Sequence, residues 1–367
     1  MSKGNEQVWD KKIQQYHGGQ EWKFLKNFVE DFSVTTNGLG APVSAMEAAK
    51  NAVIECTHYP PANQEPAKSS LAKFLWPETW EEDNDRLLLG NGASELIDLI
   101  MRLAPKGTWK AGPFAAQYKE YERSATNNGY TIIDGGENDT KANVSCLVNP
   151  CNPTGDYMEV DEVLEWILNN VTSGGFAIID ESMQPWHSKD FRNHSLCFHK
   201  EKIQRLFSEM SISVYVIHSW TKLWSCTGLR LGSIVCPNTS AAMELKKIQV
   251  PWSVNLPALA FLDAATRDVD YLNRTWEVTP KWRKNTVELL NKHFPKWSCH
   301  GKEFLSWVWV DTGSTEVATR AVDIAKSAGV PVRSGVHGYK MPTFIRLAVR
   351  SEEKFKILLD AWVASGM

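Results

Sequence analysis

The sequence predicts an α/β fold: a large domain with a mostly parallel sheet, followed by a smaller α+β domain. Through the first two thirds of the chain, short apolar runs alternate with helices of amphipathic spacing, as βαβ units do. The apolar runs end in polar residues, which predicts a site at the carboxyl ends of the strands. The chain has 367 residues, more than one core usually holds, so two domains are expected.

Apolar runs mark the expected strands. In the large domain, strands are expected at 86–89, 144–148, 176–179, 214–217 and 231–235. A short strand and a turn are expected within 31–40, and a long helix is expected to begin near Leu256. In the small domain, strands are expected within 304–310, 330–333 and 344–350. The expected division is an N-terminal arm, 1–40, packed with the small domain, then a large domain, 41–255, and a small domain, 256–367.

Composition narrows the classes of function. The net charge is −3 and there is no basic run, so nucleic acid is not an expected partner. No stretch has about 18 uninterrupted apolar residues, so no membrane span is expected. The first residues lack an apolar signal region, which favours a cytosolic chain. The seven cysteines form no Cys-x-x-Cys pair, so reduced thiols are expected, with no disulfide frame and no metal site.

The most specific motif is Ser219-x-x-Lys222-x5-Gly-x-Arg230-x-Gly232, which follows an apolar run. A lysine that forms a Schiff base must first lose its proton, and a nearby cation or desolvation favours that loss. Arg230 could supply this cation while it holds a phosphate, and Ser219 could add a hydroxyl donor. A lone lysine after a strand is usually an ordinary solvated residue, but the full pattern is far more specific.

Other candidate residues also lie at strand ends. The turn before Ala93 and Ser94 could bind an anion at a helix N-terminus, although many glycine turns only cap a helix. Asp180 ends a buried strand, where a carboxylate is costly unless it is paired. Tyr118 could cover a flat ring, but an aromatic residue there is more often part of the core.

Three further residues belong to the arm and to the small domain. His17 precedes two glycines that would let the backbone approach an anion, although a solvated loop histidine is the more common case. Arg333 and Arg346 lie among apolar neighbours. They could bind an anion or could be solvated edge residues.

Taken together, these motifs resemble those of pyridoxal-phosphate enzymes of the aspartate aminotransferase fold type. The resemblance covers nearly the whole chain and points to the histidinol-phosphate aminotransferase branch. Within this branch the chain most resembles the threonine-phosphate decarboxylases of cobalamin biosynthesis. The stretches that carry the closer resemblance are His17-Gly-Gly, Asp31-Phe-Ser with Asn37 and Leu39-Gly40, Tyr121-Glu-Arg, 251–255 and 346–353.

The resemblance implies a role for each candidate residue. Lys222 would carry pyridoxal 5′-phosphate, Asp180 would pair with its ring nitrogen, Asn152 would donate to its phenolate oxygen, and Tyr118 would stack on its ring. The cofactor phosphate would be held by Ala93, Ser94, Ser219 and Arg230. Tyr59 would reach the phosphate of a neighbouring subunit, which implies a homodimer with a shared site. His17, Gly40, Arg333 and Arg346 would bind a phosphorylated amino acid.

The sequence also departs from the aminotransferase pattern. Met183 stands where aminotransferases of the branch carry a tyrosine. The decarboxylases lack this tyrosine as well. The segment around 191–199 is longer than usual. We therefore expect decarboxylation of O-phospho-L-threonine or O-phospho-L-serine, with histidinol-phosphate aminotransferase or a related transaminase as the alternative. A non-catalytic regulator with this fold would have lost Lys222, Asp180 or Arg230, and all three are present.

Overall fold

The computed structural model describes residues 17–133 and 140–367, which form two compact units. The larger unit comprises 39–152 and 156–278, and the smaller comprises the described residues up to Gly38, then 153–155 and 279–367. The division lies inside a helix at Thr279, further along the chain than the expected boundary after 255. The start of the chain, on which the expectation of a cytosolic location rests, lies outside the described residues. Within the described ranges, no helix is both long and apolar enough to cross a membrane.

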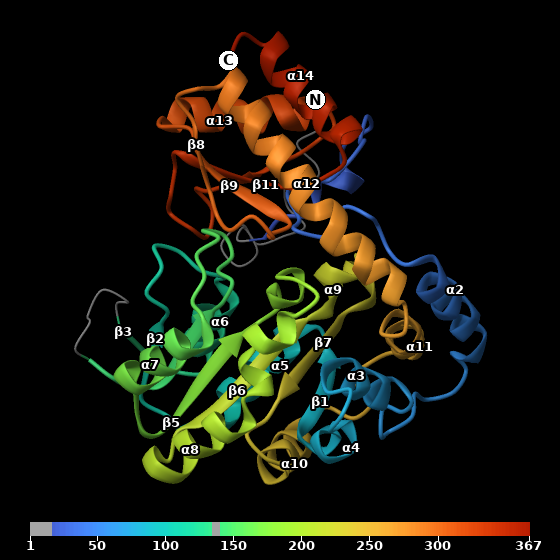
Figure 1. Cartoon of the computed structure of the whole chain (residues 1–367), viewed down its shortest axis with the longest axis vertical. Coiled ribbons are helices and arrows are strands. Elements are labelled where there is room, and N and C mark those ends of the chain that lie inside the picture. Colours follow the sequence, from blue (N-terminus) through green and yellow to red (C-terminus); the bar gives the residue numbers. More distant parts are fainter. Residues whose placement is uncertain (1–16, 134–139) are drawn as a thin grey trace. The chain divides into compact units, whose positions relative to one another are not determined.

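Within the described residues, the larger unit is built on seven strands in the order β1-β7-β6-β5-β4-β2-β3 (Figure 1). Strands β2 to β6 pair in parallel, whereas β7 runs antiparallel to both β1 and β6. The strands are β1 Leu87–Asn91, β2 Thr108–Ala111, β3 Thr131–Ile133, β4 Ala142–Val148, β5 Val171–Asp180, β6 Ser213–Ser219 and β7 Leu231–Val235.

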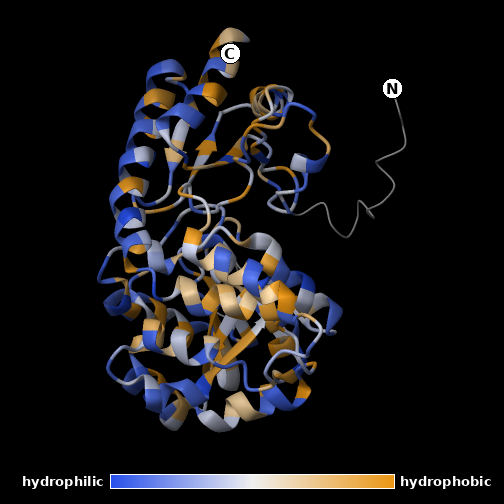
Figure 2. Cartoon of the chain, turned by 90° about the vertical axis from the view of Figure 1, so that its right-hand side faces the viewer, coloured by the Kyte–Doolittle hydropathy of each residue, from blue (hydrophilic) through white to orange (hydrophobic). Residues whose placement is uncertain are grey.

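Helices pack against this sheet and bury its apolar residues. The core joins Leu96, Ile97 and Ile100 of α5 to strand residues such as Cys146 and Ile178. In Figure 2 the strands of this unit are mostly coloured as hydrophobic, as expected for a sheet covered on both faces. The helices are α2 Val43–Ala52, α3 Ala67–Leu75, α4 Trp80–Asp83, α5 Ala93–Leu103, α6 Glu120–Asn127, α7 Val160–Asn170, α8 Lys200–Met210, α9 Trp220–Leu223, α10 Thr239–Ile248 and α11 Leu256–Ala265.

The smaller unit has an antiparallel sheet whose described strands run in the order β10-β11-β9-β8. Its core includes Phe32, a residue of the expected N-terminal arm, which is fully buried. The strands are β8 Ser298–His300, β9 Trp307–Asp311, β10 Arg333–Ser334 and β11 Phe344–Ala348, and the helices are α13 Thr315–Ser327, α14 Glu352–Ala364 and the second part of α12, Val269–His293.

Two expected elements differ from the structure for identifiable reasons. The helix expected to continue from Leu256 is divided into α11 and α12, because the Asp268 carboxylate accepts a bond from the Tyr271 amide and starts a new helix. Residues 31–40 form no strand. Instead, the carbonyls of Asp31, Val34 and Thr36 accept hydrogen bonds from the buried guanidinium of Arg350. A side chain thus satisfies acceptors that a neighbouring strand would otherwise satisfy.

Candidate active site

Lys222 lies in the short helix α9, directly after β6. The register of the sheet brings the end of β6 beside the end of β5, because Ile217 pairs with Asp180. Nζ of Lys222 is 3.4 Å from Oγ1 of Thr221, which is itself 2.9 Å from Oγ of Ser219. The hydroxyl of Tyr271 lies 3.0 Å from the carbonyl of Leu223, which helps to hold this short helix. The lysine is therefore presented at the carboxyl edge of the parallel strands, as the sequence predicts.

Asp180 ends β5 and is almost completely buried. The Tyr121 hydroxyl donates to Oδ2 of Asp180 at 2.8 Å, and the amide of Ser182 donates to Oδ1 at 2.9 Å. Burial raises the pKa of Asp180, while the bonds from Ser182 and Tyr121 and the charge of Lys222 act in the opposite direction. Burial, and then the charge of Asp180, raises the pKa of Tyr121 well above its usual value, so the phenol remains a donor. A carboxylate held in this way suits a cationic partner.

Ser182 connects the two halves of this arrangement. Its amide binds the Asp180 carboxylate, and its hydroxyl accepts a hydrogen bond of 2.7 Å from the amide of Ser219. One residue thus joins the group at the end of β5 to the group at the end of β6. Ser182 could not be recognised from the sequence, because the contact depends on the register of two strands that are separated by 32 residues of chain.

The predicted anion site is formed where β7 meets the start of α5. Gly92 precedes the helix with φ of +77°, and a Cβ at this position would collide with the guanidinium of Arg230. A Cβ at Gly232 would stand 2.5 Å from the amide nitrogen of Ala93. Glycine is therefore required at both positions. This close packing brings Arg230 to the N-terminus of α5, where Ala93 and Ser94 lie, and such a combination can bind a phosphate.

The remaining cofactor candidates of the larger unit occupy different surroundings. Asn152 lies in the loop after β4, the strand that pairs with β5 next to Asp180. Tyr118 comes just before α6, with its ring 6.4 Å from that of Tyr121. Tyr59 is instead 76% exposed and stacks on Trp252 at 4.4 Å.

Gly40 has φ of +79°, and its carbonyl lies 2.7 Å from the Tyr271 hydroxyl. The same hydroxyl contacts the carbonyl of Leu223, which follows Lys222 in α9. Tyr271 therefore brings Gly40, a residue of the predicted substrate site, close to the helix that carries the lysine.

In the smaller unit, Arg333 of β10 pairs directly with Arg346 of β11, and both are buried. Nη2 of Arg346 donates to the carbonyl of Ser33 at 2.6 Å, and Nη1 lies 3.4 Å from the Tyr339 hydroxyl. Burial and, less strongly, the charge of Arg346 lower the pKa of Arg333. His17 is exposed, but the amide of Gly19 donates to the Ser33 hydroxyl at 3.0 Å. The arm and Arg346 thus meet at Ser33.

A second buried carboxylate, Glu181, follows Asp180 and was not selected from the sequence. It accepts hydrogen bonds from the Ser195 hydroxyl and, at 2.6 Å, from the amide of Leu196. Its Oε2 is 3.8 Å from Nε2 of His218, the residue before Ser219. Burial raises the pKa of Glu181 to about 7 and lowers that of His218 to about 3. In the sequence, Glu181 could have been found from its place in an acidic pair at the end of an apolar strand.

The groups of the larger unit fit one kind of molecule. Lys222 offers an amine that can condense with a carbonyl group, and Asp180 offers an anion for a ring cation. Arg230 and the N-terminus of α5, where only glycine fits at 92 and 232, suit a phosphate. Pyridoxal 5′-phosphate carries all three features, so these residues fit it.

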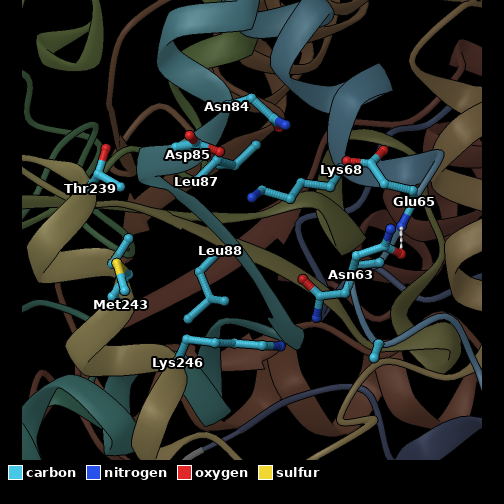
Figure 3. Close-up of a pocket in the computed structure, with 13 residues that line it drawn as sticks. Asn63, Glu65, Lys68, Asn84, Asp85, Leu87, Leu88, Thr239, Met243 and Lys246 are labelled. Carbon is cyan, nitrogen blue, oxygen red and sulfur yellow. Dashed lines mark hydrogen bonds between the residues drawn. The ribbon is translucent and has the colours of Figure 1, made fainter.

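A separate pocket of about 440 Å³ lies elsewhere in the larger unit and contains none of the candidate residues (Figure 3). It is lined by Leu87 and Leu88 at the start of β1, whereas the predicted phosphate site follows the end of that strand. Lys68 and Lys246 extend into it. We assign this pocket no part in the candidate active site.

Comparison with known proteins agrees with this chemistry. Residues 31–361 match the family described as aminotransferase class I and II. A histidinol-phosphate aminotransferase of Mannheimia succiniciproducens is 26% identical over 341 residues, which cover 89% of this chain and 87% of the relative.

Two solved structures share the fold. Histidinol-phosphate aminotransferase of Sinorhizobium meliloti, in complex with pyridoxal-5′-phosphate, has a TM-score of 0.78 at 17% identity and covers 100% of both chains. L-threonine-O-3-phosphate decarboxylase of Porphyromonas gingivalis has a TM-score of 0.72 at 17% identity and covers 92% of this chain and 99% of the other. Together with the family match over most of its length, these findings show that the chain belongs to the class I and II aminotransferases, has the type I fold of pyridoxal-phosphate enzymes, and uses pyridoxal 5′-phosphate as its cofactor.

Proposed function

We propose that this enzyme transfers an amino group to or from a small phosphorylated substrate of the histidinol phosphate type. The observation that carries the proposal is the buried pair Arg333 and Arg346, whose backbones are directly opposite each other on β10 and β11. Two guanidinium groups in this position repel each other, and a bound phosphate or carboxylate would relieve that repulsion. The relatives named as histidinol-phosphate aminotransferases support amino transfer over the decarboxylation that the sequence first suggests.

The residues of the larger unit divide the chemical work between them. Bound pyridoxal phosphate supplies an electron sink for the bond that breaks at the substrate α-carbon. Asp180 keeps a negative charge beside the ring nitrogen, supported by the hydrogen bonds from Tyr121 and Ser182. Lys222 would hold the cofactor, and its amine would move a proton at the substrate α-carbon.

Further residues orient the cofactor and the substrate. Ala93, Ser94, Ser219 and Arg230 hold the phosphate, Asn152 donates to the phenolate oxygen, and Tyr118 covers the ring. In the smaller unit, His17 would bind the substrate with the two arginines, and Gly40 is a further candidate for substrate binding.

We also propose a homodimer in which Tyr59 reaches the phosphate of the neighbouring subunit. Tyr59 and Trp252 form an exposed aromatic stack, and Val53, Ile54 and Val250 are exposed apolar residues of the same unit. Burial of such side chains against a second copy would remove apolar area from water.

A second candidate, decarboxylation of O-phospho-L-threonine or O-phospho-L-serine, is favoured by one residue. Met183 is buried, with 4% of its surface exposed, and it cannot donate a hydrogen bond to the phenolate oxygen. The protein would select between the two reactions by the way in which its side chains orient the substrate. If the arginines held the phosphate of the substrate, its carboxylate would be able to leave as carbon dioxide.

One experiment separates these reactions. Purified holoenzyme is assayed for glutamate formed from histidinol phosphate and 2-oxoglutarate, and in parallel for labelled carbon dioxide released from the carboxyl groups of O-phospho-L-threonine and O-phospho-L-serine. We expect glutamate from histidinol phosphate and at least about 100-fold lower kcat/KM with unphosphorylated histidinol, because charge-assisted bonds to phosphate are lost. Release of carbon dioxide without an amino acceptor would establish the second candidate. Absence of both activities in cofactor-loaded enzyme would overturn both candidates.

A further inference from the structure

A cluster of ionisable side chains lies away from the candidate active site, beside the N-terminus of α7. Glu159, His187 and His194 each bring one possible metal-ligating atom, and these atoms lie within 4.8 Å of one another. Nδ1 of His194 is 3.1 Å from Oε2 of Glu159, and the two imidazole rings are 4.0 Å apart, centroid to centroid. The proposed reaction uses none of these three residues.

The local structure holds each of these residues in place. Glu159 is the N-cap of α7 and forms a capping box with Glu162, so its carboxylate has a fixed position at the helix end. Nδ1 of His187 is 3.1 Å from the Ser188 hydroxyl, a contact that orients the ring. Outer contacts of this kind are typical of metal-binding histidines.

His194 ends the 3₁₀ helix η5, Phe191–His194, which is anchored by a buried phenylalanine. Phe191 has 2% of its surface exposed, and its ring stacks 5.8 Å from that of Phe74. The turn therefore places His194 beside Glu159, which comes from a distant part of the sequence.

The donor types of the cluster suit a metal cation. Neutral imidazoles and a carboxylate are the ligands that Zn²⁺ and similar ions bind.

We propose that Glu159, His187 and His194 bind a divalent transition-metal ion with the ligand preference of Zn²⁺. Ligand atoms around tetrahedral zinc are about 3.4 Å apart. Side-chain rotations that move the three ligand atoms by about 1 Å would bring them to this spacing. The side chains of Glu159 and His194 are 57% and 35% exposed, which lets an ion enter and leaves a coordination position for water. The bound ion would tie the segment that carries His187 and His194 to α7. This site is independent of the reaction that the enzyme catalyses.

The test is calorimetric titration of ZnCl₂ into untagged holoenzyme that has first been dialysed against EDTA. Glu159→Gln retains a side-chain oxygen for the helix cap, and His194→Gln retains a polar side chain, but each removes one ligand. The matched control is His199→Gln, which removes an exposed imidazole of the same segment that contacts the carbonyl of Asn193. Bound-cofactor absorbance confirms that every variant is folded.

We expect one Zn²⁺ site in the wild-type protein, at least about tenfold weaker binding in Glu159→Gln and His194→Gln, and unchanged binding in His199→Gln. Co²⁺ should give a visible spectrum of low coordination number in the wild type, and His194→Gln should lose it. Equal Zn²⁺ affinity in the wild type and both ligand variants would place the ion elsewhere, for example at the exposed Cys56, and would overturn the proposal. Absence of Zn²⁺ binding by the wild type would also overturn it.

Discussion

Replacement of the buried carboxylate of Glu181 by an amide should change how stability depends on pH. Burial raises the pKa of Glu181 from its ordinary value of 4.5 to about 7. Between these values the folded protein keeps a proton that the unfolded chain has lost. Protonation therefore stabilises the fold at low pH, and this contribution is lost as the pH rises through 7. The Glu181→Gln variant resembles the protonated form at every pH and should therefore keep this stabilising contribution.

The difference between the two pKa values corresponds to about 3.4 kcal/mol in full, of which about 2.5 kcal/mol falls between pH 5 and pH 8. His218 has its own effect, because its pKa is lowered to about 3 and its contribution is lost as the pH falls below 6.5. Since His218 is present in both proteins, its effect largely cancels when the variant is compared with the wild type at each pH.

The assay is urea unfolding of wild-type and Glu181→Gln holoenzyme, followed by tryptophan fluorescence at several pH values with saturating cofactor. As the pH rises from 5 to 8, the unfolding free energy of the variant should increase by about 2.5 kcal/mol relative to that of the wild type. Glu78→Gln, a change at an exposed residue of the same unit, is the control and should show no such trend. A difference that stays constant over this range, or shifts toward the wild type as the pH rises, would refute the reasoning.

Three further predictions concern the cofactor and substrate residues. Lys222→Ala should lose the covalent link to the cofactor, read by borohydride reduction and mass spectrometry; a reducible link that persisted would show that another amine carries it. Asp180→Ala should weaken cofactor binding more than 100-fold, because breaking a buried ion pair costs about 3–5 kcal/mol, and Tyr121→Phe should weaken it by about tenfold through one lost hydrogen bond; near-normal turnover in Asp180→Ala would contradict this. Arg346→Lys keeps the charge but loses the planar fork, so KM for the phosphorylated substrate should rise at least about tenfold, and unchanged kinetics in both Arg346→Ala and Arg333→Ala would exclude the pair from the site.

Much of the larger unit was predictable, because its principal strands are short apolar runs that end in polar residues. Strand β2 was not predicted, because it is short and includes the polar residue Lys110. That lysine is buried and donates to the carbonyl of Thr140. The predicted strand within 31–40 was wrong because Arg350 binds carbonyls of that segment, and a contact across more than 300 residues leaves no local pattern.

In the candidate site, too, the sequence reveals some residues but not the contacts that support them. Lys222, Asp180 and Arg230 stand out because each has a chemical type that is unusual at its position. The contacts that support them do not stand out, because the link through Ser182 depends on which strands are neighbours in the sheet.

The bond from Tyr121 to Asp180 joins residues 59 apart and follows from the packing of α6. The sequence also showed no sign of the cluster of Glu159, His187 and His194, because the two histidines become neighbours of Glu159 only in the folded chain.

The position of β7 between β1 and β6 has a consequence for synthesis on the ribosome. Gly90 pairs with Gly232, and the phosphate site needs Gly232 packed against Ala93, so the N-terminal half of this site must wait for a segment translated much later. Until residue 235 has emerged, β6 has an unpaired edge and β1 has no partner strand in the sheet, and such edges pair readily with other chains. The nascent protein is therefore unable to take up its cofactor, and is most exposed to misassembly, until the seventh strand is in place.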